Sequence, residues 1–407
     1  MSTAPLAGGF VPPHDADHEV VERKGLGHPD TLADGIAELA SIRYAQYCLR
    51  EFGAVLHHNL DKVAVFGGCV AFGDRDGHYV RPLRIVFGGR ASFSFAGTPV
   101  PVVDILSAAA GEQLRAALPG FEQVRLEVRV ATTDSSKFAH WFTPRGLEDL
   151  PERTRVRCND TAYLVGAAPR TRTEVIALLA EAWLAEHTWS GSDIKVLLAR
   201  HRHRFQATVC VPALAGRLGT TAEFRDLLAA AEKSLTQLVR THCPDEIEVE
   251  FRCNTKENTT VDGPLSGQYF TVSGSAVDYG EDGLVGRGNA RHGLISPAHA
   301  AGNEVTFGKN PTYHVGKVGA WLADHAATTL SHIAGPCRVG LAWRIGAAYD
   351  DPATVQITTR EWCIDDERRV REALTERDWL ADLVDGQRYR PRVEPVVDLL
   401  TELAHAH

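Results

Sequence analysis

Apolar residues recur along the chain in two alternating patterns, one typical of helices and the other of strands. Between residues 29 and 53, Leu32, Ile36, Leu39 and Ile42 follow one another at helical spacing, which predicts a helix that ends at Gly53. The same spacing predicts helices over 101–120, 171–187, 220–242, 312–334 and 365–384. Strand patterns lie between them, over 62–73, 124–132, 204–214, 246–253, 337–349 and 353–360. This order predicts an α+β fold of several similar strand–helix units without a long linker.

The composition is that of an ordinary globular protein, with 407 residues of which 44% are hydrophobic and 23% charged. The net charge of −9 gives no reason to expect a nucleic-acid partner, because such proteins usually carry a basic face. No apolar stretch reaches the roughly 18 residues of a membrane-spanning helix, so no membrane partner is expected. Residues 1–20 lack the basic start and apolar core of a secretory signal. We therefore expect a cytoplasmic protein with a flexible segment over residues 1–20.

The eight cysteines are spread along the chain, and no two of them form a CxxC pair. Their spacing therefore gives no indication of a zinc site. Most stand in apolar or strand-like stretches, which is typical of reduced, buried thiols in a cytosolic protein.

One short segment, ERKGLGHPD at residues 22–30, lies directly ahead of the first predicted helix. Its glycines allow the backbone to approach a ligand closely, and its proline suits the first turn of a helix. A helix N-terminus attracts anions, and a carboxylate at Asp30 can hold a metal ion that bridges to phosphate. Asp30, Asp34 and Glu38 follow at intervals of four and share one helix face. The structural alternative is that Asp30 only complements the helix dipole and that His28 is an ordinary loop residue.

A second glycine-rich segment, GEDGLVGRGNARHG, occupies residues 280–293. Its carboxylates at Glu281 and Asp282 suit Mg²⁺, and Arg287 can neutralise phosphate oxygens, so the segment predicts a metal–polyphosphate site. The alternative is a β-hairpin with an acidic turn. Neither GxxxxGK[ST] nor a GxGxxG that follows a strand is present, so the common nucleotide-binding loops are excluded.

Two further segments carry cations. In FGKNPTYHVGKVG, residues 307–319, Lys309 and Lys317 stand around an Asn-Pro turn that leads into a predicted helix, where a phosphate could bind. In GSDIKVLL, Asp193 and Lys195 share one face if the segment is extended. The alternative for that second pair is a surface ion pair without a functional role.

Taken in order, eight motifs identify a family resemblance: ERKGLGHPDTLADGIAE, LHHNLDKV, GGRA, NDTAYLVGAAP, DIKV, GEDGLVGRGN, GLISP and GKNPTYHVGK. They run from Glu22 to Lys317, and together they resemble the archaeal-type S-adenosylmethionine synthetases, or methionine adenosyltransferases. The resemblance implies an α+β fold of three similar sheet-plus-helix domains around a pseudo-threefold axis. It implies that residues 21–407 form one catalytic unit of three interleaved subdomains. It also implies a homodimer, or a dimer of dimers, in which sheets pack together and the active sites lie in the interface.

The reaction implied by the resemblance joins ATP and L-methionine. The methionine sulfur attacks C5′ of ATP and expels the triphosphate, which the enzyme then hydrolyses to diphosphate and phosphate. The implied cations are Mg²⁺ and, as a second candidate, K⁺.

The resemblance also assigns roles to individual residues. The implied catalytic residues that contact the phosphates are His28, Lys195, Arg287 and Lys309. The implied residues of the ATP and phosphate site are Glu22, Asp193, Gly286 and Lys317. Asp160 would hold the amino group of the amino acid, and the implied metal ligands are Asp30, Glu281 and Asp282.

The chain departs from the family pattern mainly on the amino-acid side. After the predicted strand LEVRV it reads ATTDSS, where the family has a GQGS-like run. Residues 59–62 read NLDK where the archaeal pattern is NTDQ-like, and Ala162 and Ala167 stand where the family more often has Ser and Tyr. The acidic loop has Glu281 where the family usually has Asp. The residues expected to bind the triphosphate therefore match the family pattern better than those expected to bind the amino acid.

These departures leave two alternatives to a methionine adenosyltransferase. One is a sibling enzyme that acts on ATP C5′ or on triphosphate with a different nucleophile. The other is a non-catalytic ATP-binding homologue, against which the presence of His28, Lys195 and Arg287 argues.

Overall fold

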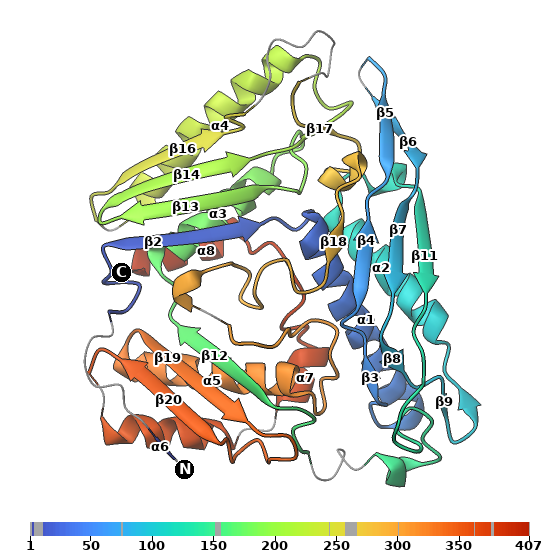
Figure 1. Cartoon of the computed structure of the whole chain (residues 1–407). Coiled ribbons are helices and arrows are strands. Elements are labelled where there is room, and N and C mark those ends of the chain that lie inside the picture. The colour runs from blue at the N-terminus through green and yellow to red at the C-terminus, as the bar shows by residue number, and fades with distance from the viewer. Residues whose placement is uncertain are drawn as a thin grey trace.

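A computed structural model describes residues 2–3, 11–74, 76–150, 156–243, 245–256, 267–299, 301–361, 363–375 and 378–406. The predicted α+β class is confirmed: three four-stranded sheets, each with long helices on one face, are arranged around a common centre (Figure 1). Each sheet has its own hydrophobic core, which packs between the sheet and its helices.

The first sheet combines the segment before the first helix with strands from the middle of the chain. Its order is β16-β14-β13-β2, made of β2 (His18–Lys24), β13 (Lys195–His201), β14 (Arg204–Cys210) and β16 (Glu248–Cys253). The helices α3 (Arg172–Ala185) and α4 (Thr221–His242) cover one face.

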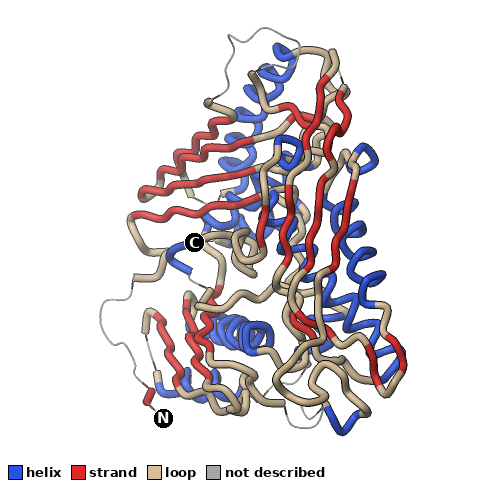
Figure 2. The backbone as a smooth tube through the Cα atoms, turned by 45° about the vertical axis from the view of Figure 1, so that its right-hand side comes forward, coloured by secondary structure: helices blue, strands red, loops and turns tan. Residues whose placement is uncertain are grey.

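The second sheet belongs to the unit that carries the first helix. Its order is β11-β7-β4-β18, made of β4 (Val63–Phe66), β7 (Leu83–Phe87), β11 (Leu126–Val130) and β18 (Gly283–Leu284). The helices α1 (Pro29–Phe52) and α2 (Val102–Ala117) pack on one face, and Figure 2 shows them in a layer beside the strands. The sequence between β18 and the next long helix, α5 (Val315–Ala334), runs through the centre of the molecule (Figure 1).

The third sheet combines a strand from the N-terminus with strands from the middle and the later part of the chain. Its order is β1-β20-β19-β12, made of β1 (Ser2–Thr3), β12 (Ala162–Ala168), β19 (Cys337–Trp343) and β20 (Thr354–Thr359). The helices α5 and α6 (Ile364–Ala373) and the short helix α7 (Trp379–Val384) contribute to its core. The last helix, α8 (Val396–His405), packs instead into the core of the first sheet.

Short two-stranded ladders complete the fold. They are β3 (His58–Asn59) with β8 (Arg90–Ala91), β5 (Cys69–Phe72) with β6 (Gly77–Arg81), β9 (Ser94–Phe95) with β10 (Thr98–Pro99), and β15 (Ala213–Leu214) with β17 (Phe270–Thr271).

Several element boundaries differ from the sequence prediction. The strand predicted over 204–214 is divided into β14 and β15, and the strand predicted over 337–349 ends at Trp343. The strand predicted over 62–73 is two strands, β4 and β5, separated at Gly67 and Gly68. The helix predicted over 365–384 is two helices, α6 and α7, and residues 376–377 between them lie outside the described part. The predicted flexible segment, residues 1–20, also lies partly outside it, although β2 already begins at His18.

The faces of the sheets that carry no helix are exposed. Along β13 and β14 the side chains alternate between buried and exposed, so one face packs on the helices and the other meets solvent. Large apolar side chains lie on these open faces: Val20 is 46% exposed, Leu197 44%, Phe66 37% and Leu284 47%. Where such side chains join into a large contiguous patch, they mark a surface that another molecule covers.

The eight cysteines all lie within the described residues, where they form no disulfide bond. The prediction of buried thiols holds for only half of them, because Cys69 and Cys243 are partly buried and Cys210 and Cys363 are exposed. No helix among the described residues combines the length and the apolarity that crossing a membrane requires. The cytoplasmic location expected from the sequence stays a prediction.

Candidate functional site

The candidate site is built on the N-terminus of α1. Helix α1 begins at Pro29, because the proline needs no hydrogen-bond acceptor at this position and His28 caps the helix. The His28 ring accepts through Nδ1 a hydrogen bond of 3.2 Å from the backbone N–H of Asp30. At the other end Gly53 adopts the left-handed conformation that stops the helix. The predicted bounds of this helix are therefore confirmed.

The two glycine-rich segments meet at this helix start, although they lie far apart in the sequence. The backbone N–H of Lys24 donates to Asn289 Oδ1 (3.0 Å), and Asn289 Nδ2 donates to the carbonyl of Lys24 (2.7 Å). The ammonium of Lys24 contacts Asp30 Oδ2 (2.9 Å) and the carbonyl of Arg287 (2.5 Å). Lys24 and Asn289 thus organise the site, and sequence reasoning missed both. The only available signal was their position inside the motifs ERKG and GRGN.

The acidic face of α1 holds the second segment in place. Asp30 Oδ1 accepts from the backbone N–H of Leu284 (3.1 Å), and Asp34 Oδ1 accepts from that of Gly286 (2.7 Å). A Cβ atom on Gly288 would lie 2.2 Å from Asp34 Oδ2, so only glycine fits there. Burial raises the pKa of Asp34 well above its ordinary value. The prediction that these acids share one helix face is confirmed. The role of Asp34 on that face is to hold the backbone of the second glycine-rich segment.

The third acid of this face is engaged by a different loop. Glu38 accepts from the backbone N–H of Gly308 (3.0 Å) and forms an ion pair with Lys317. Both side chains of that pair are 1% exposed. Burial lowers the pKa of Lys317, while the charge of Glu38 raises it. Lys317 is thus directed at a carboxylate inside the protein, and its phosphate role stays a prediction.

Cations surround the start of α1 on its open side. Lys195 pairs in register with Lys24 on the neighbouring strand, and its ammonium lies 3.2 Å from Glu22 Oε1. The Lys195 side chain is 45% exposed, and Arg287 is exposed as well. The His28 side chain remains 20% exposed. The structure therefore brings together the predicted site residues Glu22, His28 and Lys195, with Lys24 among them, and places the backbone carbonyl of Arg287 against Lys24.

The charge state of His28 follows from its surroundings. Burial is the largest effect and lowers its pKa below the ordinary value, while the charge of Asp193 raises it and that of Lys24 lowers it. The ring is therefore neutral at pH 7. Because Nδ1 accepts from the N–H of Asp30, we assign the ring proton to Nε2, which leaves one N–H donor.

Asp193 anchors the loops around this site. Its Oδ2 accepts from the hydroxyl of Tyr269 (2.9 Å) and from the backbone N–H of Ala276 (2.9 Å), and the residue is 5% exposed. It thus fixes the loop before residue 280 against the strand that carries Lys195. Direct contact of Asp193 with a nucleotide stays a prediction.

Lys309 lies beside a later part of α1 rather than beside the start of this helix. Its ammonium contacts Asp61 Oδ2 (2.9 Å) and Glu304 Oε1 (2.5 Å), and the residue is 3% exposed. The described contacts do not join it to the cations around His28. Its role toward a phosphate stays a prediction.

The predicted metal ligands lie in two settings. Asp30 is 8% exposed and contacts Lys24, whereas Glu281 and Asp282 are exposed at the start of β18. Asp282 Oδ1 accepts from the backbone N–H of Gly67 (3.0 Å). Among the described residues, no group of three or more His, Cys, Asp or Glu side chains is arranged to hold a metal ion. The protein alone therefore provides no metal cage there.

Asp160 lies in a different unit, just ahead of β12. It is exposed, and its Oδ1 accepts from the backbone N–H of its neighbour Thr161 (2.7 Å). The adjacent Asn159 accepts from the N–H of Val315 at the start of α5. No contact within the described part of this chain joins Asp160 to the cations around His28.

Known proteins resemble most of the chain. A family model described as S-adenosylmethionine synthetase matches residues 10–383. A Streptococcus pyogenes serotype M3 protein, named only as uncharacterized, is 34% identical over 378 residues, which are 89% of this chain and 90% of the relative. The S-adenosylmethionine synthase of Thermoplasma volcanium is 33% identical over 358 residues, or 85% of this chain and 87% of the relative. A solved structure of an unusual S-adenosylmethionine synthetase from Campylobacter jejuni superposes with a TM-score of 0.56 at 14% identity, covering 95% of this chain and 99% of its own.

Proposed function

Because the chain belongs to the S-adenosylmethionine synthetase family, we propose that it is a methionine adenosyltransferase that makes S-adenosylmethionine from ATP and L-methionine. One observation carries the proposal: Lys24, His28 and Lys195 gather at the N-terminus of α1, where two glycine-rich segments meet and the backbone of Arg287 contacts Lys24. A helix N-terminus surrounded by cations and glycine-rich backbone is suited to a polyphosphate.

The proposed reaction needs stabilisation of its leaving group. The sulfur of methionine is a neutral thioether and attacks C5′ of ATP without a general base, while the triphosphate departs with several negative charges. Donors and cations fixed in advance lower that barrier, because they do not have to reorganise as the charge develops. Lys195 and Arg287 are exposed to such a group, and the Nε2–H of neutral His28 can donate to its oxygens.

Lys24 has a positioning role in this proposal. Its ammonium is already engaged by Asp30 and by the carbonyl of Arg287. It therefore holds Arg287 near the start of α1 and offsets the charge of Asp30.

The donor set fits a phosphate-bridged Mg²⁺ rather than a metal held by protein alone. Mg²⁺ is commonly bound by one or two carboxylates together with substrate phosphates. Asp30 at the start of α1, or Glu281 and Asp282 on the exposed segment before β18, would hold the ion, which would neutralise phosphate charge. A K⁺ requirement is proposed only from the family resemblance.

We further propose that two copies form the working enzyme. The open sheet faces carry Val20, Leu197, Phe66 and Leu284, which a second copy would cover. Asp160, exposed and remote from the His28 cations within one chain, would meet them across such an interface. There its carboxylate would hold the ammonium group of L-methionine.

Mass spectrometry of the products tests the proposed reaction. The protein is incubated with ATP and Mg²⁺, with and without L-methionine, and a third sample contains EDTA. We expect S-adenosylmethionine, diphosphate and phosphate only when L-methionine and Mg²⁺ are both present. ATP consumption that does not depend on L-methionine would instead favour a sibling enzyme with another nucleophile. No consumption under any condition would favour a non-catalytic homologue.

A further inference from the structure

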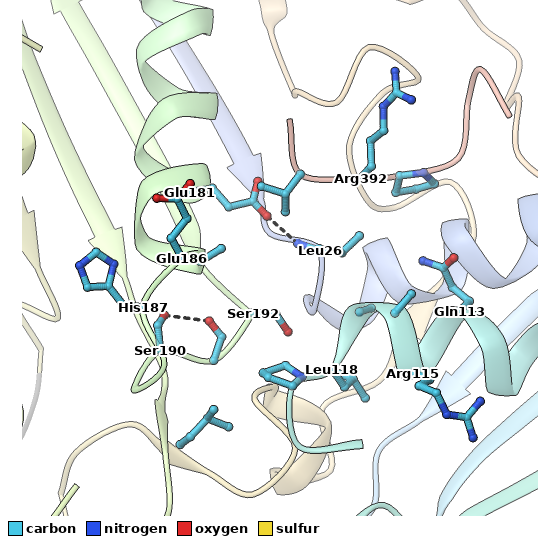
Figure 3. A pocket seen from close by; sticks show the side chains of 18 of the residues that line it. Leu26, Gln113, Arg115, Leu118, Glu181, Glu186, His187, Ser190, Ser192 and Arg392 are labelled. Atoms are coloured by element: carbon cyan, nitrogen blue, oxygen red, sulfur yellow. Dashed lines mark hydrogen bonds between the residues drawn. The ribbon is translucent and has the colours of Figure 1, made fainter. Parts of the chain in front are cut away.

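A cavity of about 710 Å³ lies behind the loop that connects β2 to α1 (Figure 3). It is enclosed by the C-terminal ends of α2 and α3, by the loop before β13, and by residues 387–393 near the end of the chain. Leu26 lines the cavity, whereas His28, two residues further on, does not. Its volume lies in the range of about 300–1,000 Å³ that is typical of small-molecule sites.

The wall of the cavity combines apolar surface with arginines. Leu26, Leu118, Leu214 and Val393 supply apolar contacts. Four arginines border it, Arg115, Arg217, Arg390 and Arg392. Figure 3 shows Arg115 and Arg392 at its edge with their guanidinium groups extending outward, and both side chains are exposed. The guanidinium of Arg115 lies over the ring of Phe121.

The positive charge of this wall is only partly offset. Glu181 also lines the cavity, but its carboxylate is engaged by Arg23 Nε (2.5 Å) and by the backbone N–H of Leu26 (2.8 Å). Among the described residues, Arg217 and Arg392 have no side-chain hydrogen bond or ion pair. Glu186 is the other carboxylate of the wall.

Arg390 is the most fixed of the four arginines. Its guanidinium donates to the amide oxygens of Gln113 (2.9 Å) and Gln387 (3.0 Å), and Glu112 is 3.8 Å away. The side chain is 20% exposed. Burial is the largest influence and lowers its pKa, while the charge of Glu112 raises it and that of Arg43 lowers it. An anion in the cavity would give this guanidinium a further partner.

The same wall is the back of the candidate active-site loop. The backbone N–H of Leu26 is held by Glu181, and that of Gly27 donates to the carbonyl of Ser192 (2.9 Å). Leu26, Glu181 and Ser192 all line the cavity. A Cβ atom on Gly27 would lie 2.2 Å from Ser192 Oγ, so the loop and this wall are packed too closely to move independently. A ligand against Leu26 and Ser192 would therefore change the position of His28 and Lys195.

We propose that this cavity is a second ligand site, which takes a small organic anion with an apolar body and which alters phosphate binding at the N-terminus of α1. The proposal that a ligand binds here rests on the cavity itself. The coupling part rests on the proposed function, because it requires that the polyphosphate of ATP binds beside His28.

Calorimetric titration of the full-length protein with 1-naphthyl phosphate tests the binding. A saturating concentration of adenosine 5′-(β,γ-imido)triphosphate with Mg²⁺ occupies the ATP site during the titration. We expect one further binding event, weakened about tenfold or more by Arg390→Ala and by the double variant Arg217→Ala/Arg392→Ala. The double variant removes no side-chain hydrogen bond or ion pair among the described residues, so it keeps the test valid if Arg390→Ala unfolds. Arg225→Ala, which removes an exposed arginine on α4, is the matched control and should bind like the wild type.

Equal binding by the wild type and the double variant, or no binding at all, would overturn the site. The coupling is measured as the affinity for the imidotriphosphate with and without 1-naphthyl phosphate. A change of at least about fivefold is expected in the wild type and in Arg225→Ala, but not in the double variant. An unchanged affinity in the wild type would overturn the coupling, and absence of imidotriphosphate binding would instead refute the proposed function.

Discussion

Lys24 and Asn289 stand 265 residues apart and are joined by two hydrogen bonds between the Lys24 backbone and the Asn289 amide. Asn289 is 8% exposed, so these bonds are protected from water. They fix the glycine-rich segment after β18 to the end of β2. The distance between the predicted phosphate ligands Arg287 and Lys195 depends on this connection.

Replacing Asn289 by alanine should therefore affect both stability and catalysis. The N–H and carbonyl of Lys24 would lose their partners, which costs about 1–3 kcal/mol of unfolding free energy when the groups are buried. The second segment would also lose its position, so kcat/KM for ATP should fall. Denaturant unfolding and steady-state kinetics measure the two effects.

Asn303→Ala is the matched control, because Asn303 likewise accepts from a backbone N–H, that of Tyr163 on β12 rather than one at the start of α1. It should leave kcat/KM for ATP unchanged. If Asn289→Ala had wild-type kinetics, the connection would be structural only.

His28 combines helix capping with a proposed catalytic role, and two variants separate them. His28→Ala removes both, so the cap should cost about 0.5–2 kcal/mol of stability and kcat should fall about 10²–10³-fold. Asparagine is a good capping residue, so His28→Asn should restore stability. It lacks the Nε2–H donor and should leave kcat low. Recovery of kcat along with stability in His28→Asn would show that His28 only caps the helix.

Asp160→Asn should separate the two substrates. The loss of a charge-assisted bond to the ammonium group weakens binding by about 1.5–3 kcal/mol, so KM for L-methionine should rise at least about tenfold. Hydrolysis of added tripolyphosphate should be nearly unaffected, since that reaction needs no amino acid. Arg287→Ala should impair both reactions, because both use the same anionic group. If Asp160→Asn impaired both reactions equally, the assignment of this carboxylate to L-methionine would be wrong.

Buried histidines should make the fold sensitive to mild acid. Burial lowers the pKa of His14, His57 and His292 to about 4 and that of His58 to about 3. Unfolded histidines have a pKa of about 6.5, so below that pH the unfolded chain gains protons that the folded protein does not. At pH 5 this costs about 2 kcal/mol of stability for each histidine.

Two buried carboxyl groups act in the opposite direction. Burial raises the pKa of Asp34 and of Asp278, so their contribution to stability grows as the pH falls. Four histidines outweigh two carboxyls, and we expect the Tm from calorimetry to fall between pH 7 and pH 5. A Tm that is constant across this range would show that the histidines are solvated or charged in the folded protein.

The long helices were predictable because their ends depend on local residues. Features that depend on packing between distant segments could not be predicted from the sequence. The proline at position 29 and the glycine at 53 gave both ends of α1, since each acts through its own backbone. Gly67 ends β4 for a different reason: a Cβ atom there would lie 2.6 Å from the backbone of Gly280. Nothing near residue 67 in the sequence indicates that approach.

The same distinction applies to the site. His28 and Asp30 were predictable because a helix start selects such residues, and they lie there. Lys317 was predicted to bind phosphate because it stands near a helix start, but its partner in the fold is Glu38, 279 residues away. Asp34 and Glu38 could be placed on one face from their spacing, but their attachment to Gly286 and Gly308 depends on the fold of two distant loops.

The central claim is that a sulfur–carbon bond forms at C5′ of ATP, and ¹³C NMR with ATP labelled at C5′ observes that carbon directly. With L-methionine and Mg²⁺ present, the signal should move from the position of a carbon bonded to phosphate oxygen to that of a carbon bonded to sulfonium sulfur. Without L-methionine it should not move. A signal that stays at the oxygen-bonded position while ATP is consumed would contradict the account, because the enzyme would then cleave phosphate bonds without transferring the adenosyl group.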